Sequence, residues 1–298
     1  MSLTAEAARA LAMAAQARHG GGSEPRAARP GGGEAHLFES DGPKGPILIK
    51  VWADSDRAAR QARRQTQVAQ ALTTGAFSVP EVLFFDASCR AMAMPKIDGT
   101  DLATVWRAGG AEVAASAGRW LRAYHGLTQY PCPFDATGQV NWLSRLIAAA
   151  QDGQRAIPDP DGFAKTARNV QAMAAGVTGR PSARAVTHRD MTLSNLMLDV
   201  DGTVWGLDFE NTREDEPLRD VFTLALDLMT LGASDGQQAV TDLRHAYGTD
   251  QTDPAVRLFL QRCFCLWVWA NTPQMPSARQ LRRLEVAEDL LHRDAPVI

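Results

Sequence analysis

Three features that would place a sequence in a special class of protein are missing here. No run of about 18 apolar residues occurs, so we expect no transmembrane helix. Four cysteines in a chain of 298 residues do not suggest a disulfide framework, and Cys263 and Cys265 have core-like neighbours and no second ligand pair. A formal net charge of only −3 argues against broad binding to nucleic acid or to an anionic membrane. We therefore expect a cytoplasmic protein whose partners include neither nucleic acid nor membrane.

The composition is that of an ordinary globular enzyme, with 45% apolar and 22% charged residues. The length is sufficient for two modest lobes, each with its own core. The alanine-rich N-terminal segment contains Glu6, Arg9 and Arg18, which interrupt any continuous apolar region. We expect this segment to form an amphipathic helix and not a signal peptide.

The apolar pattern changes near residue 95. Before this point, short apolar runs predict strands, with one helix among them: strands 36–40, 47–52, 82–85 and 91–94, and helix 54–72. After it, longer periodic segments predict helices: 113–127, 142–150, 163–175, 218–231, 253–270 and 277–292. The pattern predicts an α+β fold of two lobes, a small antiparallel-sheet lobe over residues 1–95 and a larger, mainly helical lobe over residues 96–298.

The segment 186–220 carries the most informative pattern in the chain. Asp201-Gly202 is a two-residue turn signal between two short apolar runs, which predicts a β-hairpin. With these two residues as the loop, Asn195 would face Asp208 with Cβ atoms roughly 5 Å apart. Amide and carboxylate oxygens at that distance can share a hard cation such as Mg²⁺. Asp190, on the loop that enters the hairpin, is placed to accept a proton from a hydroxyl group beside the metal.

The same residues carry a resemblance to a known family. His-Arg-Asp at 188–190, Asn195, and Asp-Phe-Glu at 208–210 resemble the catalytic loop and metal-binding segment of the protein-kinase-like superfamily. The segment has glutamate where protein kinases have glycine after Asp-Phe. In this it resembles the small-molecule branch of the superfamily, the aminoglycoside phosphotransferase and choline/ethanolamine kinase family. The resemblance implies a protein-kinase-like fold with ATP and Mg²⁺ as cofactors. It also implies that a γ-phosphoryl group is moved to a hydroxyl of a small molecule, of the aminoglycoside, choline/ethanolamine or sugar type.

The resemblance assigns roles to the residues of the loop. Asp190 would be the catalytic base, and Asn195 and Asp208 would bind the metal. His188 would brace the catalytic loop, and Asp220 would hold the same loop from below. A helix-capping aspartate is the plainer interpretation of Asp220, and both interpretations can hold together.

The nucleotide would be bound by residues of the first lobe. The period of two in strand 47–52 puts Leu48 and Lys50 on one face. Lys50 would then reach the α- and β-phosphates while Leu48 covers the adenine ring, although an exposed strand lysine is common. By its order along the chain, Met94 resembles a residue of the hinge that meets the adenine edge. A loop over the β- and γ-phosphates, or else a plain flexible turn, would be formed by three glycines: Gly31, Gly32 and Gly33.

One position departs from the family pattern. A glutamate on the helix after the strand should pair with Lys50, but no glutamate occurs between Glu39 and Glu81. Counting back from Leu72, the matching position is Gln65, which can accept a hydrogen bond but supplies no full charge. This departure keeps a second hypothesis open, namely a non-catalytic kinase-like module that binds nucleotide without turnover.

The acceptor is not identified by the sequence. Glu210 and Glu214 follow the metal-binding aspartate and would attract a cationic acceptor, although a solvated acidic loop is the plainer interpretation. Trp267 and Trp269 cannot both face one direction on a helix. Core packing is the plainer interpretation of the pair, and the alternative is that one of them lines the substrate pocket.

Overall fold

The computed structural model describes residues 3–28, 34–72, 75–232, 236–249 and 251–298. The chain divides into two compact units: residues 1–101 together with 195–212, and residues 102–194 together with 213–298. Among the described residues, the first contains nine of the twelve strands and two helices, and the second is mostly helix, which confirms the predicted α+β class. The division predicted near residue 95 did not anticipate that the 195–212 segment belongs to the first unit. Gly31, Gly32 and Gly33 lie outside the described residues.

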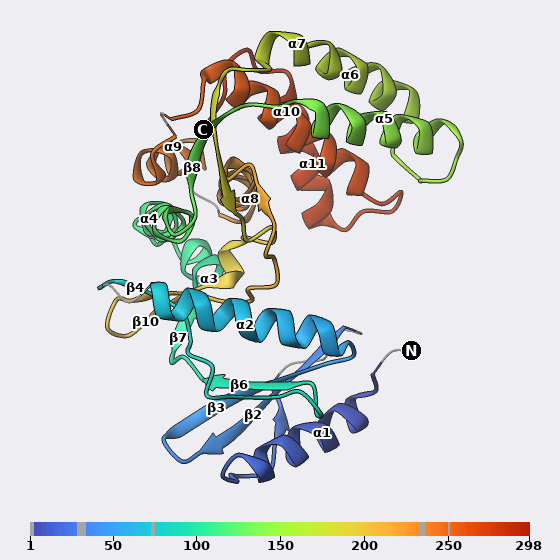
Figure 1. Cartoon of the computed structure of the whole chain (residues 1–298). Coiled ribbons are helices and arrows are strands. Elements are labelled where there is room, and N and C mark those ends of the chain that lie inside the picture. The colour runs from blue at the N-terminus through green and yellow to red at the C-terminus, as the bar shows by residue number, and fades with distance from the viewer. Residues whose placement is uncertain (1–2, 29–33, 73–74, 233–235, 250) are drawn as a thin grey trace. The chain divides into compact units, whose positions relative to one another are not determined.

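The first unit contains a sheet of five antiparallel strands in the order β1-β2-β3-β6-β5, of which β2, β3 and β6 are labelled in Figure 1. These strands are β1 (Arg26–Ala27), β2 (Ala35–Gly42), β3 (Gly45–Trp52), β6 (Ala91–Pro95) and β5 (Phe84–Asp86). Helix α1 (Ala5–Arg18) packs against the face that carries Ile47, Ile49 and Val51. Helix α2 (Ser55–Ala71) packs on the opposite face, against Trp52 and Met92. The alternation predicted for strand 47–52 is therefore confirmed.

Helix α2 brings three polar side chains to one side of this sheet. Asp54 caps the helix by accepting a hydrogen bond from Arg57 N at 2.6 Å. Arg57, Gln61 and Gln65 follow one another at intervals of one turn, so their side chains share a face of the helix.

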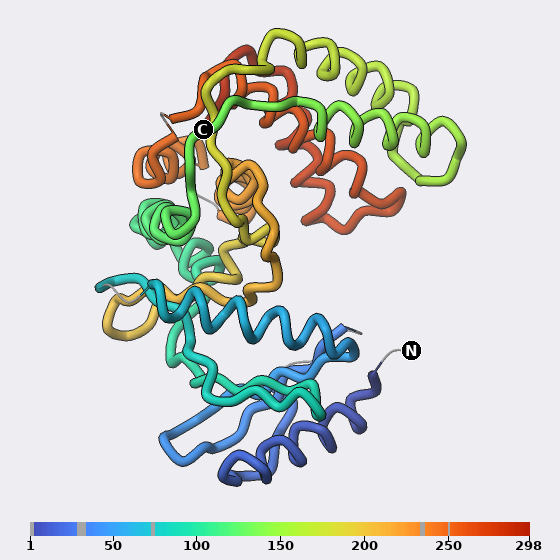
Figure 2. Tube along the Cα trace, viewed as in Figure 1, coloured from blue at the N-terminus to red at the C-terminus, as the bar shows by residue number. Residues whose placement is uncertain are grey.

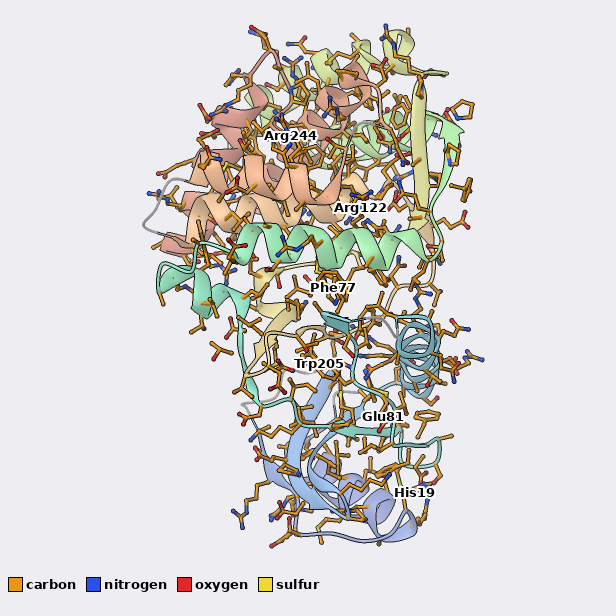
Figure 3. All side chains as sticks on the ribbon, turned by 90° about the vertical axis from the view of Figure 1, so that its left-hand side faces the viewer. His19, Phe77, Glu81, Arg122, Trp205 and Arg244 are labelled. Atoms are coloured by element: carbon orange, nitrogen blue, oxygen red, sulfur yellow. The ribbon has the colours of Figure 1, made fainter. Side chains whose placement is uncertain are left out.

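A second sheet of the first unit has the order β4-β11-β10-β7 and holds the predicted hairpin. Its strands are β4 (Phe77–Ser78), β11 (Val204–Gly206), β10 (Leu196–Asp199) and β7 (Gly99–Asp101). Phe77 on β4 and Trp205 on β11 are labelled in Figure 3. Strand β4 runs parallel to β11, whereas β10 is antiparallel to both of its neighbours.

The register of the hairpin differs by one residue from the predicted one. Leu198 pairs with Val204, so the loop contains three residues, 200–202, and not two. The Asp199 carboxylate explains this, because its Oδ1 accepts the amides of Asp201 at 2.9 Å and Thr203 at 2.8 Å. Gly202 adopts a left-handed φ of 82°, as the third residue of such a loop requires.

The second unit is built mainly of helices (Figure 2). They are α3 (Leu102–Arg107), α4 (Val113–Gly126), α5 (Thr137–Gln151), α6 (Pro160–Ala172), α7 (Ala174–Val177), α8 (Leu218–Leu231), α9 (Gly236–Tyr247), α10 (Pro254–Asn271) and α11 (Ala278–Leu291). A short sheet has the order β12-β9-β8, formed by β12 (Glu214–Asp215), β9 (Pro181–Val186) and β8 (Tyr130–Pro133). A 3₁₀ turn, Leu193–Asn195, lies where the chain passes from this unit to the first. The sequence pattern predicted neither α9 nor this sheet.

Helix α8 lies at the centre of the second unit and contacts α3, α4, α9, α10 and α11. Its residues from 220 to 228 are all buried, which confirms the burial expected from its apolar sequence. Two of these buried residues are aspartates, Asp220 and Asp227. Over the described residues, none of the helices combines the length and the apolar character needed to cross a membrane.

Candidate functional site

Asn195 and Asp208 belong to the same end of the β10–β11 hairpin. Leu207 N donates to Asn195 O at 2.9 Å, so Leu207 and not Asp208 lies across from Asn195. The expectation of a directly facing pair is therefore wrong, because the three-residue loop shifts the register by one. Asp208 has a left-handed φ of 68°, which is uncommon outside glycine and ends the strand alternation at this point. The two predicted donors are neighbours along the hairpin end and do not form a cross-strand pair.

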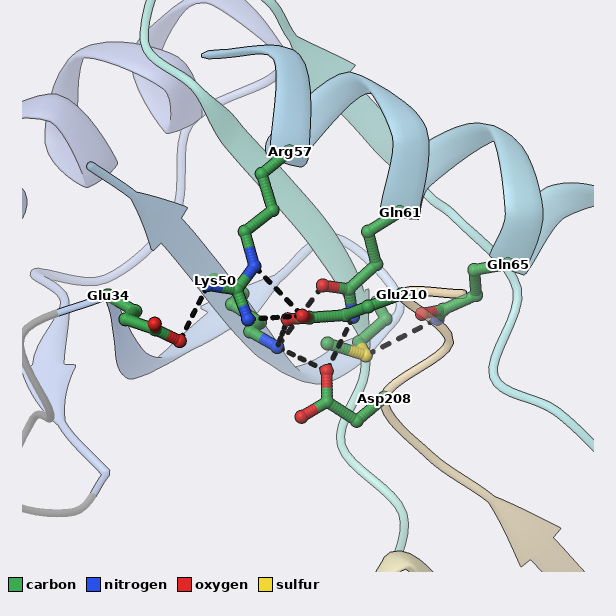
Figure 4. Close-up of polar contacts among 8 residues, drawn as sticks. Glu34, Lys50, Arg57, Gln61, Gln65, Asp208 and Glu210 are labelled. Atoms are coloured by element: carbon green, nitrogen blue, oxygen red, sulfur yellow. Dashed lines mark hydrogen bonds and ion pairs between the residues drawn. The ribbon is translucent and has the colours of Figure 1, made fainter. Parts of the chain in front are cut away.

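Lys50 binds directly to Asp208 (Figure 4). Its Nζ lies 2.5 Å from Asp208 Oδ1 and 3.2 Å from Gln61 Oε1. Gln61 Nε2 in turn donates to Asp208 Oδ1 at 2.8 Å, so the three side chains form a closed triangle of hydrogen bonds. Lys50 is buried, and its ammonium also lies 5.1 Å from the centre of the Trp52 ring, which favours a cation there.

Gln65 does not contact Lys50, contrary to the expectation from counting along the helix. Its Nε2 donates to Pro80 O at 2.9 Å and lies 3.5 Å from Met94 Sδ. Gln61, one turn earlier on the same face of α2, has the position from which a side chain reaches Lys50. Gln61 is therefore the α2 residue that contacts Lys50, and it supplies an amide and not a carboxylate.

Two carboxylates that follow β11 supply Lys50 with the negative charge that Gln61 does not provide. Glu210 Oε1 lies 3.6 Å from Lys50 Nζ, in addition to the Asp208 contact. Glu210 Oε2 accepts Arg57 Nε at 2.8 Å and also Arg57 Nη2, and Arg57 Nη1 donates to Glu34 at 2.6 Å (Figure 4). The hydrogen bond to Glu210 raises the pKa of Arg57 above its usual value. Glu210, predicted as a substrate residue, is thus engaged by two cations of its own unit.

Leu48 and Met94 are paired across strands β3 and β6. Leu48 is partly buried and packs on the cluster that contains Met94, on the same side of the sheet as Lys50. An apolar surface therefore accompanies the lysine on this side of the sheet, and the contact of Leu48 and Met94 with adenine stays a prediction.

In the second unit, Asp220 holds the predicted catalytic loop by its main chain. Its fully buried carboxylate accepts His188 N at 2.5 Å, Arg189 N at 2.9 Å and His125 Nε2 at 3.0 Å. Burial disfavours the charged form of Asp220, but the hydrogen bond and charge of His125, with the His188 amide, hold its pKa below the usual range. His125 is itself fixed by a contact of 2.9 Å between its Nδ1 and Tyr247 Oη.

Asp227 performs the corresponding task on the other side of Asp190. Its buried Oδ2 accepts Leu193 N at 3.1 Å, and Oδ1 lies 2.9 Å from Arg283 Nη1. Burial lowers the pKa of Arg283, while the negative charges of Asp227 and Asp190 oppose this shift. Asp220 and Asp227 lie two turns apart on α8, so one helix face fixes both flanks of the exposed Asp190. Sequence reasoning missed Asp227, although a second aspartate in an apolar helix was a visible signal.

A pocket of about 630 Å³ lies within the second unit. Arg189, the residue before Asp190, forms part of its wall. Four aromatic side chains contribute to the lining: Trp142, Phe222, Phe264 and Trp267. Trp269 instead packs on Phe163 with ring centres 5.6 Å apart, so Trp267 is the member of the predicted pair that faces a pocket.

Asn195 and Asp208 have the donor chemistry that Mg²⁺ requires. Among the described residues, no group of three or more His, Cys, Asp or Glu side chains could hold a metal ion alone. Mg²⁺ does not need such a group, because it is often held by one or two protein oxygens together with phosphate oxygens and water. An amide oxygen and a carboxylate at one hairpin end therefore fit this ion.

The sequence matches the family described as "Phosphotransferase enzyme family" over residues 27–259. No curated protein matches it. Among solved structures, it is similar to the macrolide 2'-phosphotransferase MphH from Brachybacterium faecium, with a TM-score of 0.60 and 15% identity over 96% of this chain and 98% of that one. For the choline kinase LicA from Streptococcus pneumoniae, the TM-score is 0.56 and the identity 12%, over 91% and 93% of the chains.

A third similar structure is a ternary complex of a thermostable mutant of aminoglycoside phosphotransferase APH(4)-Ia with AMP-PNP and hygromycin B. Its TM-score is 0.65 with 14% identity, over 96% of this chain and 97% of that one. At these identities the likeness concerns the fold alone, and it confirms the predicted protein-kinase-like architecture.

Proposed function

This chain belongs to the phosphotransferase enzyme family, and we propose that it transfers the γ-phosphoryl group of ATP to a hydroxyl group of a small molecule. The observation that carries the proposal is the contact of 2.5 Å between Lys50 Nζ and Asp208 Oδ1. It joins the lysine expected to bind phosphate to the aspartate expected to bind metal.

The first unit would bind the nucleotide. Lys50 would donate to phosphate oxygens, with Leu48 and Met94 against the adenine ring. Asn195 and Asp208 would hold Mg²⁺, which when bound neutralises charge on the phosphates. Such a site works by positioning and by charge stabilisation, because the transferred group needs little covalent help.

Glu210 would replace the helix glutamate of the family in orienting Lys50. Gln61 accepts a hydrogen bond from Lys50 at 3.2 Å but carries no charge. Glu210 carries a negative charge and lies farther from the ammonium, at 3.6 Å. Arg57 would keep Glu210 in place through its hydrogen bonds. Because Lys50 has two carboxylates beside it, the structure favours the catalytic hypothesis over a module that only binds nucleotide.

Asp190 would act as the general base. The acceptor oxygen bonds to the γ-phosphorus while the bond from that phosphorus to the β–γ bridging oxygen breaks. The hydroxyl proton passes to the Asp190 carboxylate, and ADP leaves. Asp190 is exposed, so its carboxylate is accessible to an acceptor, while Asp220 and Asp227 fix the main chain on either side.

The proposal is tested by following labelled γ-phosphate from ATP to a panel of alcohols, sugars and amino-sugars. Asp190→Ala should lower turnover by about 10²- to 10⁴-fold, while a nucleotide-dependent thermal shift remains. Asp152→Ala, which removes an exposed carboxylate at the end of α5, is the matched control and should be active. Full ATP-dependent transfer by Asp190→Ala would show that the base is misassigned, and nucleotide binding without transfer to any acceptor would favour the binding module.

A further inference from the structure

We infer that the pocket of the second unit takes the acceptor, and that this acceptor is an anionic hydroxyl compound with a flat or apolar portion, not a polycationic amine. The inference rests on the proposed phosphoryl transfer, since it names the class of molecule whose hydroxyl is used. Its starting point is that Arg189, which precedes Asp190 in the chain, lines the pocket. A ligand held there is therefore next to the loop of the proposed base.

The pocket has a wall of stacked planar groups. Phe222 stacks on Phe264 with ring centres 5.6 Å apart, and Phe264 stacks on Trp267 at the same distance. The Arg219 guanidinium extends this ladder, lying 5.9 Å from the centre of the Trp267 ring. Trp142 contributes another aromatic surface to the lining. Such a wall suits the apolar face of a sugar ring or an aromatic group.

Three arginines and three acidic residues line the pocket, and they differ in how far their side chains are exposed. Asp215 lies 3.0 Å from Arg189 and 3.8 Å from Arg219, and its side chain is 21% exposed. Glu216 lies 2.9 Å from Arg184 and is 5% exposed. The three arginine side chains are 37–41% exposed, so more guanidinium groups than carboxylates are presented to a ligand. A guanidinium group has five donors, and its fork matches carboxylate and phosphate groups.

Most of the acidic side chains at or beside the pocket are engaged within the protein. Glu214, predicted as a substrate residue, accepts the Tyr130 hydroxyl at 2.8 Å and is not part of the lining. Asp135 is the one exposed acid in the lining, and it accepts Thr137 N at 2.9 Å at the start of α5. Glu216 is 5% exposed and pairs with Arg184 at 2.9 Å, so this side chain adds little further attraction for a cation. A polycation would therefore face more exposed positive than negative charge.

The experiment uses three probes of closely similar size that differ in charge: the 4-nitrophenyl β-glycosides of glucuronate, glucose and glucosamine. Their dissociation constants for the full-length protein are measured by isothermal titration calorimetry. We expect the glucuronide to bind about tenfold more tightly than the glucosaminide, because it gains a charge-assisted hydrogen bond. Equal affinities, tighter binding of the glucosaminide, or no detectable binding of any probe would overturn the inference.

Arg219→Gln should remove most of the preference for the glucuronide while preserving a planar group beside Trp267. Arg145→Gln, which changes an exposed arginine of α5 outside the lining, is the matched control and should keep the preference. If Arg145→Gln lost the preference as fully as Arg219→Gln, the effect would be one of net charge and the inference would fail.

Phosphoryl transfer measured on the same samples separates this inference from the proposed function. A preference for the glucuronide without transfer from ATP to any acceptor supports the ligand class and counts against the proposed function. Preferred phosphorylation of the polycation kanamycin, lost in Asp190→Ala, upholds the proposed function and overturns the inference.

Discussion

The two parts of the proposed machinery are held in different ways. Around Lys50, charged side chains neutralise one another, and Asp208 and Glu210 are 32% and 30% exposed. Around the Asp190 loop, Asp220 and Asp227 are fully buried and accept hydrogen bonds from main-chain amides. The first arrangement can exchange partners when an anion arrives, whereas the second fixes the backbone. Substitutions near Lys50 should therefore change nucleotide affinity more than stability, and those on α8 should do the reverse.

The largest expected effect on stability is that of Asp220→Ala. It leaves His125 and the amides of His188 and Arg189 without their shared acceptor in the interior. Loss of a buried charged partner typically costs about 3–5 kcal/mol, so we expect a large fall in unfolding free energy in urea. Glu210→Ala, which removes a carboxylate of the Lys50 cluster, should cost much less. If the two variants lost equal amounts of unfolding free energy, the residues around Lys50 and those on α8 would not differ in their contribution to stability.

The pH dependence of stability should follow Asp220 below about pH 4. The pKa of Asp220 is lower in the folded chain than its ordinary value, so the carboxylate stabilises the fold above that value. This contribution is lost as the pH falls through the ordinary pKa toward the folded one. Thermal melts from pH 6 to pH 3 should show this loss, and Asp220→Asn should show a smaller change over the same range. An equally steep decline in the variant would assign the acid sensitivity to other groups.

A smaller effect, on the KM for ATP, is expected when the carboxylate at Glu210 is removed and one is placed at Gln61 on α2. Glu210→Gln should raise the KM for ATP by about tenfold, because Lys50 and Arg57 lose a charge-assisted contact. Adding Gln61→Glu should restore part of this loss by placing a carboxylate 3.2 Å from Lys50, where the amide oxygen now lies. Steady-state kinetics of the two single variants and the double variant measure the coupling. Additive effects would show that Glu210 does not substitute for a helix carboxylate.

The sequence predicted local patterns better than long-range partners. The alternation of β3 and the apolar α8 were predictable because strand and helix periods are local. The hairpin was predicted with the wrong register, because the Asp199 side chain, and not the Asp-Gly signal alone, determines the loop. The sequence predicted Gln65 as the α2 residue beside Lys50, whereas Gln61 makes this contact. The two residues share a helix face, and which of them reaches Lys50 depends on tertiary packing. The role of His125 depends on tertiary packing in the same way, whereas Asp227 had a local signal as a second aspartate in an apolar helix.

The most direct test of the central claim is the Mg²⁺ dependence of nucleotide binding, measured by titration calorimetry with a non-hydrolysable ATP analogue. The wild-type chain should bind the analogue more tightly with Mg²⁺ than with EDTA. Asp208→Asn should remove this difference, whereas Lys50→Met should weaken binding under both conditions. If Asp208→Asn kept the full effect of Mg²⁺, the hairpin end would not be the metal site and the account given for this chain would be contradicted.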